Sequence, residues 1–198
     1  INNIYLNSPK TQSPVRILYV ISGLGVGGAE KSLCNLVLQT PADRYHQLVI
    51  SLSGEGFYSE ILRKNGIEVI HLDIGRLKKI FASLLILRKI LKSSRPTVLH
   101  GWMYHGNLVA TLAARFFSDV NPKIYWSVRQ SLDELNSLKI RTRVIIYLNR
   151  LLSKHVSGII YNSEKARVQH EGFGYFSRRS HVIPNGFDIE RYISNEIK

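Results

Sequence analysis

Four glycines that could form a phosphate-binding turn lie in the stretch Ile21-Ser-Gly-Leu-Gly-Val-Gly-Gly-Ala-Glu30. They separate an apolar run from residues of helical periodicity, and Gly23, Gly25 and Gly28 match the pattern G-x-G-x-x-G. Glycines at such a place let the backbone N–H groups of a helix N-terminus approach an anion closely. The stretch therefore predicts a phosphate-binding turn, with a purely structural turn as the alternative.

The kind of phosphate ligand depends on what surrounds this turn. A dinucleotide site needs an Asp or Glu about 20 residues further on, at the end of the second strand, where this chain has Ser51-Leu-Ser53. A P-loop needs a lysine after its last glycine, and Gly28 is followed by alanine. NAD-type dinucleotide binding is kept only as an alternative, and Gly27 and Gly28 are the candidate contacts to a diphosphate.

A second group of chemically active side chains follows a later apolar run. Aromatic faces can stack on sugars, and imidazole and amide groups donate to and accept from hydroxyls. The group predicts a loop suited to binding a sugar; structural histidines are the alternative, and no Cys or acid lies close enough to suggest a zinc site. Its members are His100, Trp102, Tyr104, His105 and Asn107.

The elements that must position these residues alternate between strand and helix patterns, which is typical of an α/β doubly wound parallel sheet of about seven strands. Ligands of such sheets bind at the carboxyl ends of the strands. The expected strands are 15–21, 46–52, 67–72, 97–101, 123–128, 157–161 and 181–183. The expected helices are 29–39, 58–65, 77–93, 104–117, 138–153 and 163–171, with Ser163 starting the last helix and Gly66 ending the second.

The charge of the chain is concentrated in two segments. The 198 residues carry a net charge of +13. Residues 74–118 hold eight Lys or Arg and residues 135–163 hold five, and neither segment holds an acid. This concentration predicts a one-sided basic surface that would meet anionic lipid, nucleic acid or a phosphorylated substrate.

Composition and length indicate the number of domains and the expected location of the protein. Its length and its 44% apolar content predict one globular domain. The single cysteine, Cys34, is expected in the core, since it follows the period of an apolar helix face. No stretch has the length of a membrane span, residues 1–14 read as a tail without a signal core, and we expect a cytoplasmic protein.

Four segments resemble retaining GT-B glycosyltransferases of family 4. Residues 16–33 are similar to the family's opening strand, Gly-Gly loop and first helix, and Thr97-Val-Leu-His-Gly-Trp-Met-Tyr-His-Gly-Asn107 resembles its fourth strand and polar loop. Tyr161-Asn-Ser-Glu-Lys-Ala166 and Val182-Ile-Pro-Asn-Gly-Phe-Asp188 resemble its "N-S-E … V-I-P-N-G-x-D" close. The resemblance extends over residues 16–188.

The resemblance implies an N-terminal Rossmann-like domain that faces a second one across a cleft. It divides the chain into a tail at 1–14, an acceptor-side domain at 15–184 and the start of an interdomain linker at 185–198, with the donor domain absent. Asn185-Gly186 is then a hinge between the domains. These residues alone are predicted not to transfer sugar.

The resemblance also assigns roles. Gly27 and Gly28 match the loop that approaches the diphosphate of a UDP- or GDP-sugar donor, with no metal ion needed. The acceptor would be a glycan or a lipid-linked sugar, lined by the group from His100 to Asn107. Arg129 matches a position where many members carry a catalytic histidine. Its guanidinium stays protonated, so it would anchor phosphate or sugar hydroxyls and not act as a base; a surface arginine is the alternative.

The basic segments admit two further partners. An anionic membrane surface would suit a lipid-linked acceptor. A basic, non-enzymatic nucleic-acid-binding domain is the rival from another functional class, but no signature of such a module is present, and we expect no nucleic acid as partner.

Overall fold

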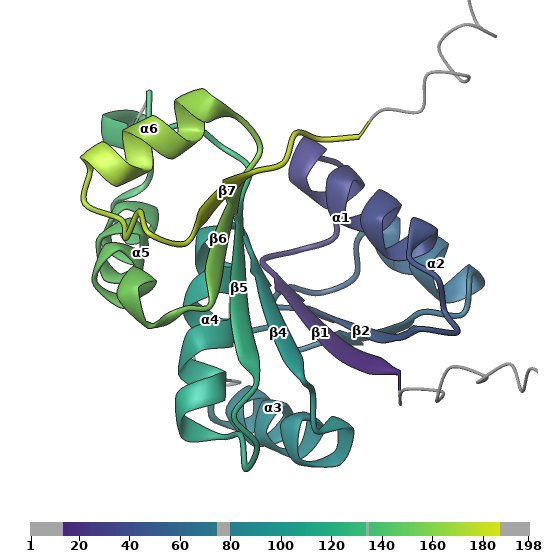
Figure 1. Cartoon of the computed structure of the whole chain (residues 1–198). Coiled ribbons are helices and arrows are strands. Elements are labelled where there is room, and N and C mark those ends of the chain that lie inside the picture. Colours follow the sequence, from purple (N-terminus) through teal and green to yellow (C-terminus); the bar gives the residue numbers. More distant parts are fainter. Residues whose placement is uncertain (1–13, 75–79, 134, 187–198) are drawn as a thin grey trace, which may run out of the picture.

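The computed structural model describes residues 14–74, 80–133 and 135–186, and its centre is a seven-stranded parallel sheet with helices on both faces (Figure 1). The strands are β1 Val15–Ile21, β2 Tyr45–Ser51, β3 Glu68–His71, β4 Val98–Trp102, β5 Lys123–Val128, β6 Gly158–Tyr161 and β7 Ser180–Val182. The helices are α1 Gly28–Gln39, α2 Phe57–Lys64, α3 Ile80–Ser94, α4 Met103–Phe116, α5 Ile140–Leu152 and α6 Glu164–Gly172. Short 3-10 turns occupy Leu135–Ser137 and Ser153–His155. The expected Rossmann-like α/β class is confirmed.

The strand order is β3-β2-β1-β4-β5-β6-β7, so β1 to β3 extend the sheet to one side and β4 to β7 extend it to the other. The switch point lies between β1 and β4. β1 and β4 are paired in parallel register, and their last residues, Ile21 and Trp102, are partners. The chain leaves β1 through the glycine loop toward α1 on one face of the sheet, whereas β4 passes directly into α4 on the other face, which opens a crevice at the carboxyl ends of the two strands. The glycine turn and the residues after Trp102 therefore meet at the switch point of the sheet.

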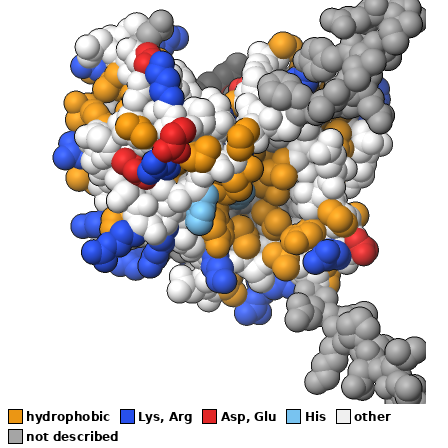
Figure 2. Space-filling model, turned by 45° about the horizontal axis from the view of Figure 1, so that its top comes forward, with side chains coloured by type: hydrophobic (Ala, Val, Ile, Leu, Met, Phe, Trp, Pro, Cys, Tyr) orange, Lys and Arg blue, Asp and Glu red, His pale blue; other side chains and the backbone are white. Residues whose placement is uncertain are grey.

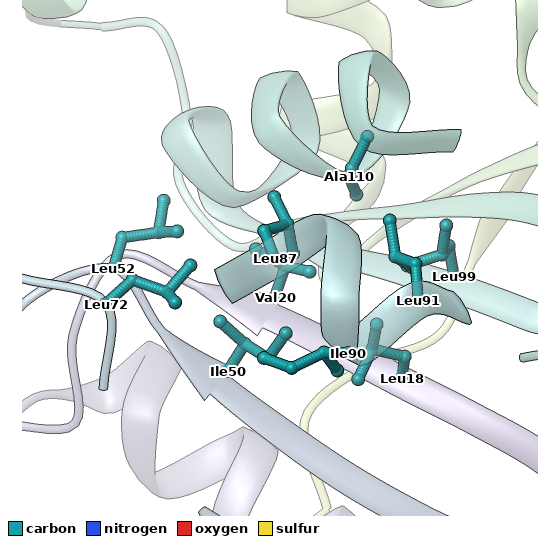
Figure 3. Packing of buried hydrophobic residues seen from close by; sticks show 11 residues of the cluster. Leu18, Val20, Ile50, Leu52, Leu72, Leu87, Ile90, Leu91, Leu99 and Ala110 are labelled. Carbon is teal, nitrogen blue, oxygen red and sulfur yellow. The ribbon is translucent and has the colours of Figure 1, made fainter. Parts of the chain in front are cut away.

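Buried apolar side chains cover both faces of the sheet, as a parallel sheet requires. On one face, β1, β2 and β4 pack against α3 and α4 through Leu18, Leu99, Leu87, Leu91 and Ala110 (Figure 3). On the other face, α1 and α2 pack on the same strands, and Cys34 is buried there as expected. A third cluster joins β5 and β6 to α4, α5 and α6.

The element limits differ from expectation by a few residues. β7 begins and ends one residue earlier than expected, α5 is shorter at both ends, and α4 begins one residue earlier, at Met103. Ser163 caps α6 as expected, since its hydroxyl accepts from the Ala166 N–H, and Gly66 has a φ of 79° after α2. The expected start of the third helix, at 77, lies outside the described residues. No helix in the described ranges is long and apolar enough to cross a bilayer.

Two glycines allow α4 to lie unusually close to the sheet. A Cβ atom on Gly106 would overlap the carbonyl oxygen of Val20 in β1, and one on Gly101 would lie 2.5 Å from the Cα of Asn107. Neither glycine has a positive φ, so space and not backbone freedom demands glycine here.

The close approach predicts the effect of one methyl group. Gly106→Ala should lower the free energy of unfolding by about 2 kcal/mol, because the overlap with Val20 forces α4 away from β1. Urea denaturation measures this change. Gly172→Ala in α6 is the matched control, since nothing lies within 4 Å of its Cβ position. Equal stability of the two variants would contradict this account of the packing.

Candidate functional site

The glycine loop between β1 and α1 rests on the start of α2. Leu24 accepts from the Tyr58 N–H at 2.9 Å, and Gly56 touches the Leu24 backbone so closely that a Cβ on Gly56 would not fit. Ser53 fills the space beside Gly23, where a Cβ would lie 2.7 Å from its hydroxyl oxygen. The loop thus packs on Ser53 and the start of α2 with one side, and its other side faces the crevice.

Gly27 and Gly28 differ in what surrounds them. Gly27 is the N-cap of α1 with an extended backbone, φ −173°, that any residue can adopt, and the carboxylate of Glu30 occupies the space of its missing side chain. Gly28 has nothing within 4 Å of its Cβ position. The first N–H groups of a helix have no carbonyl partner within it, so an anion would reach them over Gly28, beside the Glu30 carboxylate.

Trp102 connects the end of β4 to the glycine loop. Its indole is fully buried, and its Nε1–H donates to the Ala29 carbonyl in the first turn of α1 at 2.9 Å. The next residue, Met103, has a φ of 62°, a left-handed conformation that is rare for a residue with a side chain. Backbone strain of this kind clusters at functional sites and is held by the surrounding structure.

Arg129 follows β5 and lies over the indole of Trp102, with its Cζ 4.7 Å from the ring centroid. Its Nη1 donates to the Ile183 carbonyl at 3.1 Å and to Asn185 Oδ1 at 3.0 Å, and Nη2 donates to Ser127 Oγ at 3.4 Å. Burial lowers the pKa of the guanidinium, which nevertheless stays charged at neutral pH. Arg129 therefore fastens the segment after β7 to the sheet.

Ser32 completes this contact from α1. Its hydroxyl donates to the same Asn185 Oδ1 at 3.1 Å, so Asn185 accepts from two elements that are far apart in sequence. A pocket of about 260 Å³ lies at this junction. Polar, mostly uncharged groups with one guanidinium and one indole line it: Ser32, Asn35, Gln39, Trp102, Arg129 and Asn185, with Leu36, Ile183, Pro184 and Gly186.

His100 lies beneath Arg129 on the same face of the sheet. Its ring is buried among aromatic rings, 5.5 Å from Tyr19 and 5.3 Å from Trp102, and its Nε2 is 2.9 Å from Ser127 Oγ. Burial first, and the charge of Arg129 second, lower the pKa of His100 to about 3. The imidazole is therefore neutral at physiological pH.

The other predicted acceptor residues occupy different surroundings. Tyr104 is buried on the α5 and α6 side, where its hydroxyl is 2.9 Å from His170 Nε2. Asn107 is fully buried against Gly101, with no hydrogen-bond partner on either amide atom. His105 is half-buried, and burial lowers its pKa.

The five residues thus do not form one surface. The structure brings His100 and Trp102 together with Arg129, and it places Tyr104 and Asn107 on the opposite side of the sheet. Only His105 keeps more than marginal exposure. An acceptor-lining role for the group stays a prediction; the buried members shape the loop from within.

The dinucleotide alternative finds no ribose carboxylate at the end of β2. Ser51 is fully buried there, and its hydroxyl donates to the Ser53 carbonyl at 3.1 Å. The acid that follows, Glu55, pairs with Arg63 at 2.6 Å and with His71 at 3.2 Å.

Sequence reasoning missed the residues that hold the site together. Ser32 and Ser127 carry no local signal, because each acts through a partner distant in sequence. The strain at Met103 likewise has no sequence signal. The sequence predicts Asn185 as part of an interdomain hinge, and no sequence signal indicates its side-chain contacts with Ser32 and Arg129.

A glycine turn after β1, at the switch point of a parallel sheet, and an arginine after β5, two strands away, define a Rossmann-like domain suited to an anionic ligand. The family model described as Glycosyltransferase Family 4 matches residues 26–191. The chain belongs to this family, as its resemblance predicted.

Solved structures share the fold at low sequence identity. HepE from Anabaena, solved in complex with UDP and glucose, has a TM-score of 0.71 and 20% identity, over 90% of this chain and 46% of that one. The lipopolysaccharide outer core galactosyltransferase WaaB, in its apo form, has a TM-score of 0.63 and 14% identity, over 88% of this chain and 47% of that one. UDP-N-acetylglucosamine 2-epimerase from Rickettsia bellii has a TM-score of 0.59 and 11% identity, over 94% of this chain and 49% of that one.

These likenesses are consistent with one Rossmann-like domain of a GT-B fold. The chain spans about half the length of each of these proteins. No curated protein matches its sequence significantly.

The buried histidines predict how stability depends on pH. Burial lowers the pKa of His170 to about 4, as it lowers that of His100 to about 3. The unfolded chain, with histidine pKa near 6.5, binds protons that the folded chain excludes, so stability falls as pH drops below about 6.5. Each histidine should cost about 2 kcal/mol at pH 5.

Urea denaturation between pH 7 and pH 5 measures this dependence. His100→Gln and His170→Gln should each flatten the slope, whereas the exposed His181→Gln should leave it unchanged. A slope that is the same in all four proteins would rule out the buried histidines as its source.

The contacts of Arg129 predict a local effect. Arg129→Ala should speed hydrogen exchange at the Ile183 amide, which donates to the Tyr161 carbonyl, because the segment after β7 loses its anchor. The free energy of unfolding should fall by about 1 to 3 kcal/mol, the usual effect of losing hydrogen bonds to a charged group. Arg178→Ala, at an exposed arginine before β7, is the control; unchanged exchange at Ile183 in Arg129→Ala would refute the anchoring role.

Proposed function

We propose that this domain, joined to a second Rossmann-like domain, transfers a sugar from a nucleotide-sugar to an acceptor with retention of anomeric configuration. The match of Glycosyltransferase Family 4 to residues 26–191 carries the proposal. The division of the chain at about residue 184, with 185–198 leading toward the second domain, belongs to the same proposal.

The reaction breaks the bond between the sugar's anomeric carbon and the diphosphate and forms one to an acceptor hydroxyl, whose proton is released. Positive charge develops on the sugar ring and negative charge on the leaving nucleoside diphosphate. Preorganised donors aimed at the diphosphate are therefore the main requirement. The N–H groups of the first turn of α1, beside the open space at the Cβ position of Gly28, would meet this need from one side of the cleft.

The role proposed for Arg129 rests on its place after β5 and on the chemistry of its guanidinium. A guanidinium cannot remove the acceptor proton at working pH, but it can hold phosphate or hydroxyl oxygens with paired donors. Its Nε is buried without a partner, and its Nη atoms hold Ile183, Asn185 and Ser127. Arg129 would thus act on substrate only if the linker contact opens, so domain movement and substrate contact would be coupled there.

The donor is proposed to be a UDP- or GDP-sugar, in keeping with the UDP-glucose complex of HepE. The acceptor is proposed to be a lipid-linked or polysaccharide-precursor glycan, approached through the half-buried His105 in the first turn of α4. The place of action would be the cytoplasmic face of a membrane, where the basic surface meets anionic lipid.

The similarity to epimerases shows that the fold alone does not select the reaction. Family membership favours transfer. The dinucleotide alternative is disfavoured by the missing carboxylate near Ser51, and the nucleic-acid alternative by the absence of a stacking platform in the described loops.

Activity measurements test the proposal. The protein extended by its second domain should transfer sugar, and the 198-residue chain alone should show no turnover. In the extended protein, Gly28→Val should raise the KM for the donor, because its side chain fills the open space before α1. Gly172→Val in α6 is the control; turnover by the 198-residue chain, or an unchanged donor KM in Gly28→Val, would contradict the proposal.

A further inference from the structure

Glu30 is the acid in the first turn of α1, directly after the glycine turn. Residues 21–29 hold no charged side chain. The half-buried Glu30 folds back toward the start of its helix, where its carboxylate occupies the space of the missing side chain of Gly27. Gly27 therefore leaves room for this carboxylate, whereas Gly28 leaves room for a ligand, since nothing lies within 4 Å of its Cβ position.

The carboxylate of Glu30 lies where an external anion would act on α1. The first N–H groups of a helix have no carbonyl partner within it, and a negative group beside them is stabilising. Gly27 is the N-cap and supplies no side-chain hydrogen bond, so Glu30 is the negative group at this helix end. A diphosphate that approached over Gly28 would meet the same N–H groups and, beside them, a like charge.

The charge of Glu30 has no counter-charge in the part of the chain that the structure describes. None of the ion pairs between residues of the ranges 14–74, 80–133 and 135–186 includes Glu30. The titratable groups beside it are Tyr58 of α2 and Cys34, one turn further along α1. Burial raises the pKa of both groups, so both are uncharged at neutral pH.

Cations that could offset this charge are few on the same side of the domain. Arg129, at the end of β5, already donates to the Ile183 carbonyl and to Asn185. Figure 2 turns the upper side of Figure 1 toward the reader and shows uncharged side chains over most of the middle of the molecule, with Lys and Arg side chains mainly toward its margin. Repulsion between Glu30 and a bound diphosphate is therefore not cancelled from within the described domain.

We propose that Glu30 selects the charge state in which a ligand is bound at the glycine turn: a nucleotide-sugar diphosphate binds there together with a proton, which Glu30 takes up from solvent. A like charge nearby favours the neutral form of a carboxyl group, and the protonated carboxyl can donate a hydrogen bond to a phosphate oxygen. The O–H bond of Glu30 is the covalent bond that forms, and it breaks again when the ligand leaves. This inference rests on the proposed function for the identity of the ligand, and it adds Glu30 and a proton to the binding step.

Isothermal titration calorimetry tests the inference on the protein extended by its second domain, with UDP-glucose and GDP-mannose as probes. The diphosphate of these probes does not titrate near neutral pH, so proton uptake reports on the protein. Because the complex binds a proton that the free protein lacks, the affinity should rise about fivefold or more from about pH 7.5 to about pH 5.5. Titrations in buffers of different ionisation enthalpy measure the proton uptake directly.

Two variants separate the charge of Glu30 from its shape. Glu30→Gln keeps the size of the side chain, so it should bind the probe about fivefold or more tighter at about pH 7.5 and lose most of the proton uptake, since the like charge is gone. Gly27→Ala should displace the carboxylate from the helix start and also reduce the uptake, because its φ of −173° suits alanine and the methyl group would overlap the carboxylate. Glu60→Gln, in the first turn of α2, is the matched control and should behave as the unchanged protein does.

The outcomes distinguish the inference from the proposed function. A probe that binds with equal proton uptake in Glu30→Gln and in the unchanged protein, or more weakly to Glu30→Gln at about pH 7.5, would overturn the inference and leave the proposed function standing. Failure of both probes to bind the unchanged protein would overturn both. Urea denaturation checks the folding of each variant, and Gly27→Ala carries the same comparison if Glu30→Gln does not fold.

Discussion

The buried indole of Trp102 is the contact on which the candidate site depends. Its N–H holds the first turn of α1 through the Ala29 carbonyl, and its ring face supports the guanidinium of Arg129. Three strand ends are thereby related to one another: β4 bears the indole, β1 leads into the glycine loop, and β5 leads into Arg129. Because the indole is fully buried, its hydrogen bond has no water to compete with, and the positions of the loop and the arginine are tied together.

The same region combines charge with burial. Arg129 lies above His100, whose burial and positive neighbour keep it neutral, so a single cation remains at this end of β4 and β5. That cation is directed at the segment after β7 through Ile183 and Asn185. Arg129, which is expected to meet a substrate, therefore also holds the segment after β7.

The carboxyl edge of the sheet and the helix layer on one of its faces carry different kinds of side chain. Its carboxyl edge collects a glycine turn, a strained Met103 and a polar pocket, whereas the layer of α3, α4 and α5 carries apolar and basic groups on its outer face. Both arise from one topology, because the strands end at one edge and the crossover helices must lie on the faces.

Local patterns in the sequence located the strands and helices to within a few residues, together with the Ser163 cap and the glycine turn, since each depends on neighbours a few residues away. Family motifs placed the same segments in order. Only the tertiary structure decided which side chains face one another. Alternate residues of a strand point to opposite faces, and a helix that follows a strand crosses to one of them, so Trp102 joined Arg129 while Tyr104 joined His170. Ser32 and Asn185 met for the same reason: their contact spans 153 positions of the chain and exists only once the sheet is assembled.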